Sequence, residues 1–191
     1  MRTAAFNVLL VSIFALGILA GIPAQVHDQK PLRIEEPANK CNVQAYVIDP
    51  DPEGLNVRSG PGKDFALIGR LPKGDQDIEV TISGATDKWV QIDSAIRNED
   101  SAPLIQSKGW VYGPLLATQT QTRKYLRDPT APVINVYSAA SMQSSVVRKL
   151  PNETQVKIIG CKGNWVQIQY NNILGWLDPD SQCANTLTTC V

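Results

Sequence analysis

The segment Leu55-Asn56-Val57-Arg58-Ser59-Gly60-Pro61-Gly62 opens a pattern that the chain carries twice. In its first copy the pattern continues with Leu71-Pro72, Trp89-Val90-Gln91-Ile92 and Gly109-Trp110-Val111. The second copy reads Ile134-Asn135-Val136-Tyr137-Ser138, Leu150-Pro151, Trp165-Val166-Gln167-Ile168 and Gly175-Trp176-Leu177. The same apolar, turn and aromatic positions recur in the same order, which indicates one small unit folded twice.

Both copies consist of short runs rich in valine and isoleucine, separated by tight-turn sequences such as Asp-Pro-Asp-Pro-Glu-Gly at 49–54 and Ser-Gly-Pro-Gly at 59–62. Closely spaced short runs with turn residues between them are typical of β-strands, and no stretch keeps a helical period beyond one turn. The sequence therefore predicts an all-β protein with two tandem small β-barrels, because closing short strands into a barrel leaves few exposed edges.

The predicted organisation follows from where the pattern begins and ends. It comprises a signal peptide at 1–24, an extended N-terminal arm at 25–44, a first domain at 45–116, a linker at 117–130, a second domain at 131–179 and a C-terminal tail at 180–191. The first domain carries a polar insert within 93–108, where Ala95-Ile96 and Leu104-Ile105 are possible docking points. Polar composition and a proline-flanked end suggest the linker.

The N-terminus has the composition of an export signal. Met1-Arg2 is a short positive start, residues 4–22 are almost wholly apolar, and Ala24 offers a small residue for cleavage. The alternative is an uncleaved membrane anchor, since the apolar run approaches the length that spans a bilayer. We expect an exported protein with no stable membrane span after cleavage.

Four cysteines remain in the exported part: Cys41, Cys161, Cys183 and Cys190. An even number of cysteines in an oxidising compartment predicts two disulfides, and the spacing matches no zinc motif. Three pairings are possible. At least one bridge is expected within the second repeat, and Cys41 either joins the first unit to the second or pairs with a C-terminal cysteine.

Composition excludes several classes of function. The formal net charge of zero, without a basic stripe, argues against nucleic-acid binding. The single histidine, His27, lies in the arm, away from any pocket. A cysteine nucleophile activated by histidine and a histidine-bearing zinc site therefore both lack a necessary residue. We expect a non-enzymatic protein with no metal and no cofactor.

With its strands, turns and tryptophans in this order, the chain resembles the bacterial SH3-like (SH3b) domain family. The opening segment 55–62 is the most specific match, and the second copy is weaker because Tyr137 stands in place of Arg58 and Ala139-Ala140 in place of Gly60-Pro61. The resemblance implies a strongly curved antiparallel barrel of about five strands. It also implies a cell-wall or periplasmic protein that binds peptidoglycan, peptides or glycans.

Alternation along the segment that begins at Trp89 points to an outward-facing tryptophan. If Val90 and Ile92 fill the core, Trp89 and Gln91 face outward, and the same holds for Trp165. Trp89 also stands where the related eukaryotic SH3 domains place a groove tryptophan. A large apolar side chain on a surface often marks a contact site. The alternative is that each tryptophan covers its own barrel or packs between the units.

The candidate ligand-binding residues lie in the first unit and are Trp89, Arg58, Tyr112, Trp110 and Tyr46. An aromatic groove suits stacking on sugar rings or proline, with polar side chains fixing orientation. Arg58 either grips a ligand carboxylate or braces the adjacent turn through backbone carbonyls.

These observations lead to one hypothesis and one alternative. The hypothesis is a periplasmic or secreted binding protein that recognises peptidoglycan or a peptide through the first unit. The alternative is a structural or assembly subunit of an envelope complex, in which the aromatic faces pack against a partner protein and no wall ligand exists.

Overall fold

The computed structural model describes residues 34–74, 76–97, 102–121 and 133–184, and these form an all-β structure, as predicted. The predicted signal peptide, the first part of the arm, most of the linker and Cys190 lie outside the described residues. Within the described part of the chain, no helix is long and apolar enough to cross a membrane. Residues Leu32–Val191 belong to one compact unit that contains both barrels.

The first barrel is built from six strands and one short 3-10 helix: β1 (Asn39–Val47), β2 (Leu55–Arg58), β3 (Leu67–Leu71), β4 (Ile78–Thr86), β5 (Trp89–Arg97), β6 (Gly109–Tyr112) and η1 (Gly113–Leu115). Its strands pair antiparallel in the order β3-β2-β6-β5-β4-β1. Alternate positions of β4 are buried, and Val90 and Ile92 of β5 are fully buried, so the predicted inward face is confirmed.

The second barrel repeats this arrangement. Its elements are β7 (Leu116–Thr120), β8 (Ile134–Tyr137), β9 (Val146–Leu150), β10 (Gln155–Lys162), β11 (Trp165–Tyr170), β12 (Ile173–Leu177), η2 (Pro179–Ser181) and β13 (Gln182–Cys183). The strand order is β7-β10-β11-β12-β8-β9, with β13 added beside β7. The pairing of β8 with β9 shifts after Val136, as the pairing of β2 with β3 shifts after Val57. The repeat in sequence is thus a repeat in register.

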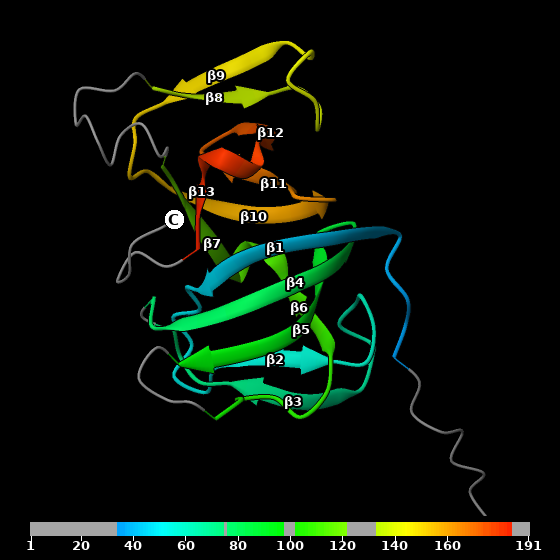
Figure 1. Cartoon of the computed structure of the whole chain (residues 1–191). Coiled ribbons are helices and arrows are strands. Elements are labelled where there is room, and N and C mark those ends of the chain that lie inside the picture. Colours follow the sequence, from blue (N-terminus) through cyan, green and yellow to red (C-terminus); the bar gives the residue numbers. More distant parts are fainter. Residues whose placement is uncertain (1–33, 75, 98–101, 122–132, 185–191) are drawn as a thin grey trace, which may run out of the picture. The chain divides into compact units, whose positions relative to one another are not determined.

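One continuous sheet joins the barrels, because β7 pairs with β1 on one side and with β10 on the other (Figure 1). This corrects two predicted boundaries. Strand β1 begins at Asn39, inside the predicted arm, and the predicted linker begins inside β7. The polar composition of β7 was misleading because its buried hydroxyls are paired: Thr118 donates to the Cys183 carbonyl at 3.0 Å and Thr120 to the Pro151 carbonyl at 2.7 Å.

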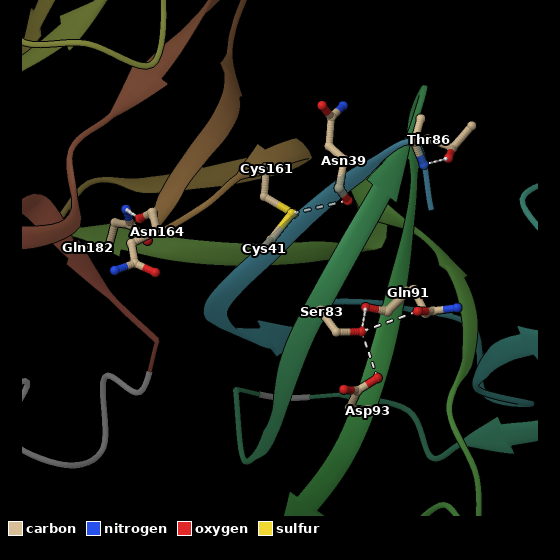
Figure 2. Close-up of a disulfide and its surroundings, with 10 residues drawn as sticks. Asn39, Cys41, Ser83, Thr86, Gln91, Asp93, Cys161, Asn164 and Gln182 are labelled. Atoms are coloured by element: carbon tan, nitrogen blue, oxygen red, sulfur yellow. Dashed lines mark hydrogen bonds between the residues drawn. A yellow bond between two sulfur atoms is a disulfide. The ribbon is translucent and has the colours of Figure 1, made fainter. Parts of the chain in front are cut away.

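A disulfide between Cys41 and Cys161 crosses the same junction, from β1 to β10 (Figure 2). Beside it, the Asn42 amide donates to the Gly163 carbonyl at 2.8 Å, and the Gly163 amide donates to the Lys40 carbonyl at 2.9 Å. Of the possible roles of Cys41, joining the two units is therefore the one realised. Cys183 is also disulfide-bonded.

Glycine in a tight turn such as Ser-Gly-Pro-Gly often supplies a left-handed backbone angle, but this is not the reason for Gly60. The residues with left-handed φ among the described glycines are Gly54 and Gly163. At Gly60 a Cβ atom would lie 2.2 Å from the Phe65 ring, so the requirement is space. The second barrel has Ala139 there, and Ser144 in place of the aromatic residue, which removes the conflict.

Of the predicted docking points of the insert, Leu104 and Ile105 pack onto the first barrel, whereas Ala95 and Ile96 belong to β5 and Ile96 is exposed. The Leu104 amide donates to the Ala95 carbonyl at 2.8 Å, and Leu104 and Ile105 are partly buried against the core. Among the described residues of the second barrel no equivalent segment covers β9, whose first four residues are exposed.

Candidate functional site

An open groove of about 540 Å³ lies on the first barrel and brings together three of the five predicted site residues, Trp89, Tyr112 and Arg58. The remaining residues of its lining are Asp49, Asp51, Gly54, Leu55, Asn56, Lys63 and Leu115. The groove therefore combines an aromatic surface with side chains of both charges. This combination suits a ligand with an apolar or ring surface and charged ends.

Neighbouring strands place the two aromatic rings side by side. Trp89 opens β5, Tyr112 ends β6, and the two residues are directly paired in register. Their ring centroids are 5.5 Å apart with planes tilted by 57°, a favourable arrangement for an aromatic pair. Trp89 is half-buried and Tyr112 is 36 % exposed, so the pair presents ring surface to the groove.

Arg58 braces the turn after β2, as one of the two readings of the sequence expected. Its Nη1 donates to the Phe65 carbonyl at 2.8 Å, which fixes the guanidinium stem beside the groove. A guanidinium has five N–H donors, so this single bond leaves donors for a ligand carboxylate. Bracing and ligand contact are thus compatible in the one side chain.

Three charged residues of the lining, Asp49, Asp51 and Lys63, were not among the predicted site residues. Asp49 and Asp51 lie in the turn between β1 and β2, where the Asp49 carboxylate accepts from the Asp51 amide at 3.0 Å and the Asp51 carboxylate accepts from the Glu53 amide at 2.9 Å. Lys63 lines the groove from the next turn. Asp49 and Asp51 stand in a segment that the sequence marks only as a turn, far from Trp89 and Tyr112 along the chain.

Two predicted site residues are not available to a ligand in this structure. Trp110 is fully buried, and Tyr46 is 1 % exposed. Trp110 lies under residues 34–38, here named the strap, which cross the outside of the barrel. The Glu35 carbonyl accepts from Trp110 Nε1 and from Gln91 Nε2, both at 3.0 Å. Gln91, expected to face solvent, is buried for the same reason.

Burial of Tyr46 has a measurable consequence at high pH. Desolvation raises the pKa of Tyr46 from 10.0 to about 12. Because the unfolded chain loses this proton first, the contribution of Tyr46 to stability is complete below pH 10 and is lost as the pH rises toward 12. We expect the free energy of unfolding to fall between pH 10 and 12 and this part of the fall to be absent in Tyr46→Phe. Urea denaturation of both proteins across this range measures it. Equal slopes would contradict the assignment.

The second barrel arranges its aromatic residues differently. Tyr137, which stands at the position of Arg58, packs edge-on against Trp165 with centroids 5.7 Å apart and planes at 79°. The ring of Tyr137 thus lies where the first barrel has a cation. Among the described residues there is no group of three histidine, cysteine or acidic side chains that could hold a metal ion.

The fold and this groove define a tandem β-barrel protein of the SH3 kind, and the chain belongs to the family described as Bacterial SH3 domain. That family matches residues 53–117 and 132–181, one segment in each barrel.

One curated relative and two solved structures extend the comparison. The chain is 27 % identical over 134 residues to a putative N-acetylmuramoyl-L-alanine amidase YrvJ of Bacillus subtilis, a match that covers 69 % of this chain and 25 % of that protein. NlpC1 and NlpC2 of Trichomonas vaginalis are each 16 % identical, with TM-scores of 0.30 and 0.28 over 80 % and 74 % of this chain. The chain spans a quarter of the amidase and about half of each of these structures, 49 % and 47 %.

Proposed function

We propose that this chain is an exported, non-enzymatic recognition protein that binds peptidoglycan or a peptide in the groove of the first barrel. The observation that carries the proposal is the groove itself, which the Trp89–Tyr112 pair lines together with two cationic residues, Arg58 and Lys63, and two acidic ones, Asp49 and Asp51. Cell-wall peptides offer amino and carboxylate groups close together, and both find an opposite charge in such a lining.

Two further findings support the proposal. Domains of the Bacterial SH3 family are often attached to cell-wall proteins, and the Bacillus relative is named for an activity on N-acetylmuramoyl-L-alanine. The disulfide between Cys41 and Cys161 favours an oxidising compartment, which for a bacterial protein is the periplasm or the exterior. With a single histidine in the whole chain, we infer recognition and no catalysis.

Replacing Trp89 by alanine tests the proposal. We expect Trp89→Ala to weaken retention on purified peptidoglycan roughly 30-fold, since truncating an aromatic residue at the centre of a binding site typically costs about 2 kcal/mol. Co-sedimentation of the exported chain with sacculi, at several protein concentrations, measures the change.

The repeat supplies a matched control, Trp165→Ala, which removes the equivalent tryptophan of the second barrel and should leave retention unchanged. Circular dichroism and thermal melting show that each variant folds. If the unaltered chain does not co-sediment, or if folded Trp89→Ala binds as well as the unaltered chain, wall recognition by the groove is wrong. In that case the assembly-subunit alternative is favoured.

A further inference from the structure

The first barrel holds an extended peptide, its own strap, across its outer face. The Glu35 amide donates to the Ser59 carbonyl at 2.9 Å, and the Glu35 carbonyl accepts from both Gln91 and Trp110. Pro37 packs over Gly84, where a Cβ atom would lie 2.3 Å from the proline ring. One residue of extended backbone is thus bound by three hydrogen bonds, one each to the turn after β2, to β5 and to β6.

The second barrel presents the same set of binding groups. Gln167 of β11 pairs with Trp176 of β12, as Gln91 of β5 pairs with Trp110 of β6. Ser138 follows β8 as Ser59 follows β2, and each donates its amide across the turn at 2.8 to 2.9 Å. The three positions that hold the strap therefore exist twice in the chain.

Only the first set is covered in the described structure. Ser59, Gln91 and Trp110 are buried at 4 %, 2 % and 0 % exposure. Their counterparts are more open, since Ser138 is exposed and Gln167 and Trp176 are half-buried. Within the described residues, the side chains of Gln167 and Trp176 form no hydrogen bond.

The surroundings of the second set differ in a way that restricts its ligand. Leu174, two residues before Trp176 and on the same face of β12, is 56 % exposed where the first barrel has Lys108. Next to Gln167, the Asp87 carbonyl lies 3.8 Å from the place of a Cβ on Gly160, the residue that corresponds to Gly84. The turn that contains Asp87 thus stands over Gly160 of the second barrel, at the position that corresponds to that of Pro37 over Gly84 in the first. A ligand here is shorter than the strap and meets an apolar side chain.

We propose that Ser138, Gln167 and Trp176 form a second binding site that takes an extended peptide segment of another polypeptide, with an apolar residue beside Leu174. The Gln167 amide and the Trp176 indole donate to one peptide carbonyl, as their counterparts do to Glu35. The strap of the same chain does not serve, because its tether to β1 keeps it on the first barrel. This site is separate from the Trp89 groove and does not depend on the function proposed for that groove.

Indole N–H signals in NMR spectra test this proposal, because the chain has four tryptophans and each gives one signal. Single Trp→Phe variants assign the signals. The probe is a capped peptide with the sequence of residues 33–36, Arg-Ile-Glu-Glu, which is shorter than the strap and lacks Pro37, added to the exported chain up to a few millimolar. We expect the Trp176 signal to move and saturate while the Trp89, Trp110 and Trp165 signals stay in place.

Gln167→Leu removes one of the two donors and should weaken the peptide about fivefold or more, the usual effect of a lost hydrogen bond. The same exchange at Gln106, an exposed residue of the first barrel, is the matched control and should not change the affinity. Three results would overturn the proposal: no movement of the Trp176 signal, equal affinity in Gln167→Leu, or movement of the Trp110 signal alone, which means that the peptide only exchanges with the strap.

Discussion

Replacement of Trp110 by alanine should lower the free energy of unfolding by about 3–5 kcal/mol, the cost of emptying a fully buried tryptophan site. The indole also anchors the strap through its bond to the Glu35 carbonyl. We therefore expect a melting temperature lower by roughly 10 °C. We also expect faster hydrogen exchange at the Glu35 amide, whose bond to Ser59 depends on the strap staying in place.

The counterpart in the second barrel is the matched control for this prediction. Trp176 occupies the same register position but is half-buried, and among the described residues its indole has no bond like that of Trp110 to the strap. Trp176→Ala should therefore cost clearly less than Trp110→Ala, about 1–2 kcal/mol, in proportion to the apolar area that it removes. Thermal and urea unfolding of both variants give the comparison. Equal losses would show that the strap adds nothing to the burial of Trp110.

The fold was predictable from sequence because its signals are local. Alternation along 89–92 identified Val90 and Ile92 as core residues, and the turn sequences marked the strand ends. Antiparallel pairing of consecutive strands then brings Trp89 beside Tyr112 without further information. The same local logic placed Arg58 next to its own turn. Features that depend on neighbouring residues and on the pairing of consecutive strands could therefore be predicted from the sequence.

The errors concern contacts between distant segments. Gln91 had the alternation of an outward-facing residue and Trp110 was a candidate for ligand contact, but the burial of both depends on Glu35, which is 56 and 75 residues away in the chain. Similarly, the threonines of β7 look like linker residues until their partners Pro151 and Cys183 are known. Burial of a polar group becomes favourable only when a partner is present, and periodicity carries no information about partners.

The groove residues Asp49, Asp51 and Lys63 were missed for another reason. Each lies in a turn, where composition already explains an acidic or basic residue, so nothing in the pattern singled it out. Their importance follows from the curvature of the barrel, which brings the turns after β1 and β2 to the edge of one aromatic surface. The three residues can be recognised as one site only in the folded barrel, where their turns lie close together.

The second large effect is expected from removal of the disulfide between the barrels. Cys41→Ala with Cys161→Ala should lower the free energy of unfolding by about 3–5 kcal/mol, because the bridge closes a loop with a sequence separation of 120 residues. Alanine is the suitable replacement, since Cys161 is 1 % exposed and a serine hydroxyl would be buried there. Urea unfolding followed by tryptophan fluorescence measures the loss.

The effect should extend beyond total stability to the coupling of the two barrels. Strands β1 and β7 share two register pairs, and two backbone bonds join β1 to Gly163, so the disulfide is the covalent link in a short junction. We expect calorimetry of the double variant to resolve two transitions where the oxidised parent shows one. Reductant provides the control: it also opens the bridge of Cys183 in both proteins, so it should destabilise the parent more than the variant, by a difference close to the deficit of the variant. A double variant that melts with the parent in one transition would mean that the continuous sheet alone couples the barrels, and that the bridge closes a junction already fixed by β7.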